Sequence, residues 1–190
     1  MQTIYRILIP GLWLIWLVYW GIAAFAAKPV RRRESVGSRI SHIVPLLLGI
    51  VLLSTPWFDN TILAARFLPV SITGFWAGAA LVAIGLLFAV TARVYLGGNW
   101  SGTVTLKQDH TLTRGGPYRF VRHPIYTGLL LAVLGNAIAM GQWRGLLALA
   151  LFLVAFLHKV SVEERFLLEQ FGDDYVHYRQ EVAALLPLLF

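Results

Sequence analysis

The chain contains no cysteine. This absence excludes disulfide bonds, metal sites built on thiolates and a cysteine nucleophile. The five histidines show no spacing typical of metal ligands, so we expect no metal site. The chain also lacks a P-loop, an HExxH helix and a glycine-rich dinucleotide fingerprint after a strand. A soluble-type nucleotide fold and a zinc protease are therefore not expected.

Charged residues are also scarce, because 13% of the chain is charged and 58% is hydrophobic. A soluble domain usually carries about 25% charged residues. A length of 190 residues suits one domain. The composition therefore predicts an all-α, polytopic membrane protein that forms a single domain, 1–190.

Five apolar runs are candidates for membrane-spanning helices, each of which needs about 20 apolar residues. We expect Pro45 and Pro124 in the first turns of their helices, where proline is tolerated. The last run is short, and we expect a tight hairpin between it and the fourth run around GQWRG. The basic KPVRRR that follows the first run favours a retained helix over a cleaved signal peptide. The runs are 7–27, 43–58, 67–92, 124–143 and 145–157.

The net charge of +7 has a membrane explanation, because cationic residues gather in cytoplasmic loops and meet anionic lipid there. With the N-terminus outside, thirteen of the sixteen Lys and Arg residues lie in inner segments, and Arg6, Arg66 and Arg144 lie outside. This asymmetry places 94–122 and 160–190 together on the cytoplasmic side of what we expect to be a bacterial inner membrane. No basic stripe lies elsewhere, so nucleic acid is not an expected partner.

The C-terminal tail has apolar residues at helical spacing opposite acidic ones, which predicts amphipathic helices on the cytoplasmic side. Gly172 would end the first of these helices. A second amphipathic helix would then run over 173–186.

Three polar stretches should meet at the inner face. Ionisable groups at membrane depth are costly and usually mark a functional site. A cavity that offers both signs of charge suits a zwitterionic ligand. The stretches are YLGGNWSG at 95–102, GPYRFVRHPIYTG at 116–128 and the pair Glu163–Glu164.

Each stretch also has a purely structural explanation. A glycine pair can cap a helix, arginines anchor helices at the membrane interface, and a histidine before a proline can cap a helix start. The glutamates can form a solvated face, with Glu163 paired to Lys159 at i,i+4 spacing.

The sequence GGPYRFVRHPIYTG, followed about forty residues later by EERFLLEQFGDDYVHYRQEV, resembles the isoprenylcysteine carboxyl methyltransferase family and the related membrane phospholipid N-methyltransferases. The resemblance covers about 96–187, and its two halves are specific only in combination. It implies an integral membrane enzyme whose S-adenosylmethionine pocket is formed by the last spans, their connecting loop and the C-terminal helices. On this reading 1–66 holds two N-terminal spans, and 67–190 holds the cofactor loop and forms the catalytic half.

The resemblance also implies which residues bind the cofactor. Glu163 and Glu164 belong to the pocket, and Gly97–Gly98 resembles a glycine element of the phospholipid enzymes. The remaining cofactor-binding positions are Tyr118, Arg119, Val121, His123, Pro124 and Tyr126.

The chemistry of these residue types agrees independently with S-adenosylmethionine. A His or Arg donor suits its carboxylate, and a glutamate suits its ammonium or ribose diol. Tyrosine rings can lie against the sulfonium or the adenine. Glycines let the backbone approach a ligand closely.

We therefore expect methyl transfer from S-adenosylmethionine to a lipid-like acceptor, such as the carboxylate of a prenylated cysteine, with membrane lipids as surroundings. Such a carboxylate needs no general base, so alignment in a desolvated pocket matters most. Arg122 or Arg179 are candidates to hold it, and Glu163 is the third candidate catalytic residue.

Four alternatives remain open at the level of sequence. They are phospholipid N-methylation, which needs a neutral amine; thiol methylation; a membrane reductase with a nicotinamide cofactor; and a scaffold without catalysis. Nothing in the helix faces specifies an oligomeric state.

Overall fold

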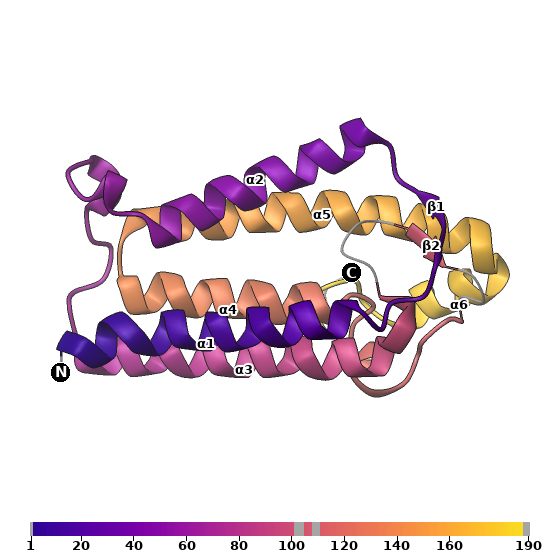
Figure 1. The fold of residues 1–190 in the computed structure, drawn as a ribbon, viewed down its shortest axis with the longest axis horizontal. Helices are drawn as coiled ribbons and strands as arrows, with labels where there is room; N and C mark the ends of the chain where they lie inside the picture. The colour runs from indigo at the N-terminus through magenta and orange to yellow at the C-terminus, as the bar shows by residue number, and fades with distance from the viewer. Residues whose placement is uncertain (1, 101–104, 108–110, 188–190) are drawn as a thin grey trace.

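The computed structural model describes residues 2–100, 105–107 and 111–187. Five long helices form one bundle, in which α1 packs on α3, α3 on α4, α4 on α5 and α5 on α2 (Figure 1). Their bounds are α1 Gln2–Ala24, α2 Val36–Ser54, α3 Ile72–Leu96, α4 Pro124–Met140 and α5 Trp143–Phe171. A short helix α6, Asp173–Glu181, follows α5.

Short elements join the helices. An antiparallel ribbon pairs β1, Val30–Arg33, with β2, Thr105–Lys107, which the sequence did not predict. The short 3-10 helices are η1 Pro56–Phe58, η2 Ile62–Ala64, η3 Gly97–Asn99 and η4 Gly116–Arg119. The ribbon and α6 lie at one end of the bundle, and the N-terminus and the α4–α5 connection lie at the other (Figure 1).

The prediction of an all-α polytopic membrane protein is confirmed. Within the described residues, four segments are long and apolar enough to span a membrane: Ile7–Ala24, Val36–Ser54, Ile72–Asn99 and Trp143–Phe171. Pro124–Met140 is a shorter apolar helix. Large apolar side chains on α1 and α2 are exposed on the outside of the bundle, as lipid contact requires.

Several predicted boundaries were wrong. Helix α2 begins at Val36, where the Ser35 hydroxyl caps it by accepting a hydrogen bond from the Ser38 amide. Pro45 therefore lies inside the helix and not in its first turn. The fifth apolar run and the first tail helix form one continuous helix, α5, of 29 residues. The tight hairpin between α4 and α5 is confirmed, with Gly141 in the left-handed conformation between them.

The second tail helix is also shorter than predicted, because α6 ends at Glu181 and not near 186. Val182 is extended, and the chain after it runs alongside the segment before α4. There the amides of Arg122 and His123 donate hydrogen bonds to the carbonyls of Ala183 and Ala184. These tertiary hydrogen bonds replace the helical ones that local sequence favours.

Helices α3 and α4 approach closely because glycines line their contact, as is common between membrane helices. A methyl group on Gly128 would lie 2.5 Å from the Gly85 carbonyl oxygen. One on Gly135 would lie 2.5 Å from the Gly78 carbonyl oxygen. This contact fixes the height and the rotation of α4, on whose start the polar site is built.

A buried arginine joins the ends of α1 and α3. The Arg93 guanidinium donates to the carbonyl oxygens of Ala23 and Gly97, both at 2.6 Å, and lies over the Trp100 ring. Gly97 ends α3 with a φ of +56°, a conformation that favours glycine. The expected helix cap at the glycine pair is therefore present.

We predict that Gly128→Ala lowers the stability of the bundle by about 1 to 3 kcal/mol, the usual cost of overpacking. The control is Gly21→Ala, because nothing lies within 4 Å of a methyl group placed on Gly21 of α1. Thermal unfolding of the purified protein in detergent measures both variants. Equal unfolding temperatures for the two would show that the α3–α4 contact tolerates a methyl group.

Candidate active site

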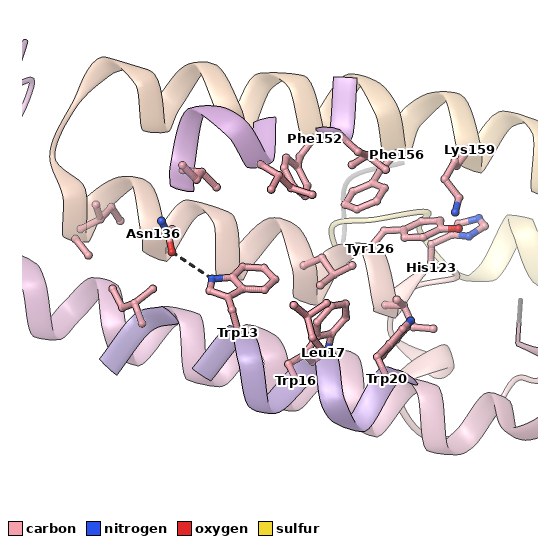
Figure 2. A pocket seen from close by; sticks show the side chains of 18 of the residues that line it. Trp13, Trp16, Leu17, Trp20, His123, Tyr126, Asn136, Phe152, Phe156 and Lys159 are labelled. Carbon is pink, nitrogen blue, oxygen red and sulfur yellow. Dashed lines mark hydrogen bonds between the residues drawn. The ribbon is translucent and has the colours of Figure 1, made fainter. Parts of the chain in front are cut away.

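A cavity of about 1440 Å³ runs inside the bundle. Tyr126 near the start of α4 and Met140 at its end both line it, so the cavity extends along the whole helix. His123, Lys159 and Glu163 line one end. Aromatic side chains from α1 and α5 line the middle, and Figure 2 shows them in the space between these two helices. The cavity thus joins a charged end to a long apolar part.

His123 lies between the two glutamates of α5. Its Nδ1 is 3.3 Å from Glu163 Oε2, and its Nε2 is 3.4 Å from Glu164 Oε1. His123 occupies the position before the first turn of α4, with Pro124 at the first helical residue, but its side chain makes no capping hydrogen bond. The His123 side chain therefore contacts the two glutamates and does not cap α4.

Tyr126 forms the next layer of this end of the cavity. Its hydroxyl donates a hydrogen bond to Glu163 Oε1. Its ring stacks between His123, at 5.8 Å, and Phe156, at 4.7 Å, with planes that are almost parallel. The Lys159 Nζ lies 5.2 Å from the centre of the Tyr126 ring (Figure 2). Aromatic stacking and a hydrogen bond thus both fix the Tyr126 ring.

Arg122 ties the C-terminal segment to this cluster. Its Nε and Nη2 donate to Glu164 Oε1 at 2.9 and 2.7 Å, and its Nη1 donates to the carbonyl oxygens of Arg179 and Val182. The guanidinium is therefore largely engaged within the fold. Arg179 is different, because its side chain is 52% exposed and its Nη1 lies 3.9 Å from Glu164 Oε2.

The ionisation of the groups outside the spans follows from this geometry. Burial alone lowers the pKa of His123, but its hydrogen bonds with Glu163 and Glu164 outweigh burial and raise that pKa. Burial raises the pKa of Tyr178 to about 12, and that of Tyr118 as well. The Tyr178 hydroxyl donates to the Tyr118 carbonyl oxygen at 2.6 Å. The phenols are therefore neutral at pH 7, and His123 keeps its proton to a higher pH than a free histidine.

The structure brings together five of the residues that the sequence singled out. They are Tyr118, Arg122, His123, Tyr126 and Glu163, all of which line the cavity. Glu164 binds Arg122 and His123 from one side.

Other predicted residues lie away from the cavity. Arg119 is exposed, with its guanidinium 4.6 Å from the centre of the Phe120 ring. Val121 is buried and pairs with Ala183. Gly97 and Gly98 are not among the lining residues, although Asn99 and Trp100 beside them are. That these residues take part in cofactor binding stays a prediction.

Sequence reasoning missed the wall that α1 contributes. Trp13, Trp16 and Trp20 line the cavity, and the rings of Trp16 and Trp20 stack at 4.6 Å. Their spacing of three and four residues places them on one helix face, which was the available signal. Lys159 was predicted to reach the membrane interface or to pair with Glu163, whereas in the structure it is buried and lines the cavity.

The fold and the cavity define a polytopic membrane protein with a large internal cavity that is charged at one end. The sequence profile of the phospholipid methyltransferase family matches residues 73–174. That match covers more than half of the chain, and the protein belongs to this family.

Individual relatives agree with the family. Protein-S-isoprenylcysteine O-methyltransferase of Schizosaccharomyces pombe is 34% identical over 109 residues, which are 56% of this chain and 46% of that protein. A probable protein-S-isoprenylcysteine O-methyltransferase of Oryza sativa subsp. japonica is 31% identical over 117 residues, 60% of this chain and 61% of the relative. Methanethiol S-methyltransferase 1 of Bradyrhizobium diazoefficiens is 37% identical over 70 residues, 37% of this chain and 24% of the relative. The chain thus spans about half the length of the isoprenylcysteine relatives that it matches.

We predict that the stability of the protein falls as the pH rises through the raised pKa of His123. Protonated His123 stabilises the fold fully below about pH 6.5, the ordinary histidine value, and this contribution is lost as the ring deprotonates. The slope is at most about 1.4 kcal/mol per pH unit, the limit for one proton. Unfolding temperatures across this range measure it, with His123→Gln as the control that lacks the slope. A variant with the same slope as the parent would exclude His123 as its source.

Proposed function

We propose that this protein transfers a methyl group from S-adenosylmethionine to a lipid-like acceptor, by O-methylation of the carboxylate of an isoprenylcysteine-type compound. The observation that carries the proposal is the single cavity in which the charged cluster of His123 and Glu163 opens into a long apolar chamber. A polar cofactor and an apolar acceptor need to meet at such a boundary. The names of the relatives, with family membership, support methyl transfer.

The residues at the charged end fit the cofactor. Glu163 and His123 offer an acceptor and a donor for the ammonium and the carboxylate, and the Tyr118 and Tyr126 rings offer aromatic faces. The Asn99 Oδ1 is buried, lacks a hydrogen-bond partner among the described residues and belongs to a lining residue, so it is free to accept from an amino group. When bound, S-adenosylmethionine supplies an electrophilic methyl group. The other predicted residues shape the surroundings of the pocket in this proposal. They are Glu164, Arg119, Val121, Pro124 and the Gly97–Gly98 pair.

The two candidate arginines take different roles in this proposal. Arg122 positions Glu164 and the C-terminal segment, because its donors already have partners. Arg179 does not line the cavity, but it is half exposed and only 3.9 Å from Glu164 Oε2, so in this proposal its guanidinium turns toward the charged end to hold the acceptor carboxylate. Glu163 accepts a hydrogen bond from the Tyr126 hydroxyl and contacts Nδ1 of His123, and so orders the reacting end of the cavity.

The proposal includes a place in the cell. The segments with most of the basic residues lie at the charged end of the bundle, which the positive-inside rule assigns to the cytoplasm, here of a bacterial inner membrane (Figure 1). A water-soluble cofactor reaches that end from the cytoplasm, and the acceptor reaches the apolar chamber from the bilayer. In this arrangement 67–190 forms the catalytic half of one domain, and 1–66 completes the chamber.

Thiol methylation is the second candidate, because one relative is named a methanethiol S-methyltransferase. The size of the cavity favours the lipid acceptor, since about 1440 Å³ of mostly apolar lining exceeds what a one-carbon thiol requires.

We predict that Glu163→Gln weakens S-adenosylmethionine binding at least tenfold, because hydrogen bonds to charged groups are among the stronger ones. Glu169→Gln is the matched control, on an exposed position of the same helix. Calorimetry on purified protein in detergent measures both, with size-exclusion profiles to establish folding. Parental affinity in both Glu163→Gln and His123→Gln would contradict the assignment of the pocket.

The acceptor is identified by an acceptor screen with methyl-labelled cofactor. Prenylcysteine analogues, phosphatidylethanolamine and small thiols are the three classes to compare. Base-labile label in the prenylcysteine product indicates a methyl ester, and alkali-stable label in the headgroup indicates N-methylation. Retention of NADPH without retention of S-adenosylmethionine would overturn the proposal in favour of a reductase.

A further inference from the structure

Asn136 is an amide side chain near the C-terminal end of the apolar helix α4. It is 9% exposed, lines the cavity and lies ten residues along α4 from Tyr126. The Trp13 Nε1 donates a hydrogen bond to its Oδ1 at 3.2 Å, across from α1 (Figure 2). Polar groups at membrane depth are rare and usually functional.

The hydrogen bond that joins α1 to α4 uses only the oxygen of the Asn136 amide. The Asn136 Nδ2 makes no hydrogen bond to any residue in the described ranges. The Trp16 Nε1, on another lining residue, is buried and equally without a partner there. If helix association were the whole purpose, the Trp13 bond would suffice and a second donor beside an apolar cavity would be a net cost.

The distance along the cavity from Tyr126 to Asn136 corresponds to a definite length of apolar chain. Ten residues of α-helix rise about 15 Å. An extended chain advances about 3.5 Å over three backbone bonds, so 15 Å corresponds to about 13 bonds. That is the span of about three isoprene units measured from the Tyr126 level. The aromatic walls of the chamber, including Phe152 and Phe156, lie along this stretch (Figure 2).

We propose that Asn136 sets the length of the apolar chain that the cavity accepts. A chain that ends before Asn136 leaves its amide free to hold water. A longer chain passes the amide and removes that water without offering an acceptor in its place. An unpartnered buried amide weakens binding by a factor of about 5 to 100. This proposal rests on the proposed function for the identity of the acceptor, but the discrimination itself concerns binding.

Two variants distinguish a role of Asn136 in selecting chain length from a role in joining α1 to α4. Asn136→Leu keeps a similar shape and removes the donor. Trp13→Phe removes the hydrogen bond to Oδ1 and keeps the amide. A purely structural Asn136 predicts that both variants act alike, whereas a length selector predicts that only Asn136→Leu shifts the preference toward longer chains.

The experiment compares S-prenylcysteine analogues of three and four isoprene units. Because longer chains gain affinity from apolar burial alone, the readout is the ratio of their affinities in each variant relative to the parent. Quenching of tryptophan fluorescence by the bound analogue gives these affinities without any methyl transfer, and kcat/KM with labelled cofactor gives a second ratio. Asn136→Ala replaces Asn136→Leu if the latter is not monodisperse.

We expect Asn136→Leu to raise the four-unit to three-unit ratio at least fivefold, and Trp13→Phe not to raise it, because the amide stays and its oxygen loses a partner. An unchanged ratio in Asn136→Leu, or an equal change in Trp13→Phe, would overturn the proposal. If the parent methylates neither analogue, the proposed function fails, and the fluorescence ratios still decide the role of Asn136.

Discussion

The contact of His123 with two glutamates is the interaction on which the rest of the site depends. Burying one charge is unfavourable unless partners of the opposite sign accompany it. Here Arg122 and His123 face Glu163 and Glu164, so each carboxylate has a basic partner. This balance lets two carboxylates lie side by side on α5 at the end of an apolar bundle. Removing any one member leaves an uncompensated charge.

The cluster also decides where three parts of the chain meet. It joins the start of α4 to α5, and through Arg122 it draws the backbone after α6 against residues 121–123. The glycine contact between α3 and α4 fixes the height of α4 from the other side. The charged end of the cavity is therefore held by electrostatics on one face and by close helix packing on the other, which gives the lining residues a defined geometry.

The sequence predicted the charged end far better than the apolar chamber. Charged residues beside apolar runs are rare enough to be informative, so the meeting of 118–126 with Glu163 followed from a few motifs. The spacing of Trp13 and Trp16 places them on one helix face but does not tell which, because a tryptophan on an apolar helix can face lipid as well as a cavity. The end of α6 was missed for another reason, since it depends on hydrogen bonds to Ala183 and Ala184 that local propensity does not contain.

The charges of the site also support the proposed carboxylate acceptor over an amine. Both carboxylates of the cluster already have basic partners, so neither is left unpaired to hold a second cation. A cationic sulfonium and an anionic acceptor compensate each other in such a surrounding, and their charges disappear as the methyl group moves, which a low-dielectric chamber favours. An ammonium acceptor adds a second cation and must first lose a proton, yet Glu163 already accepts from Tyr126 and faces His123. The same contacts that stabilise the site thus engage His123 and both glutamates, and the proposed O-methylation, unlike N-methylation, needs none of them as a free base.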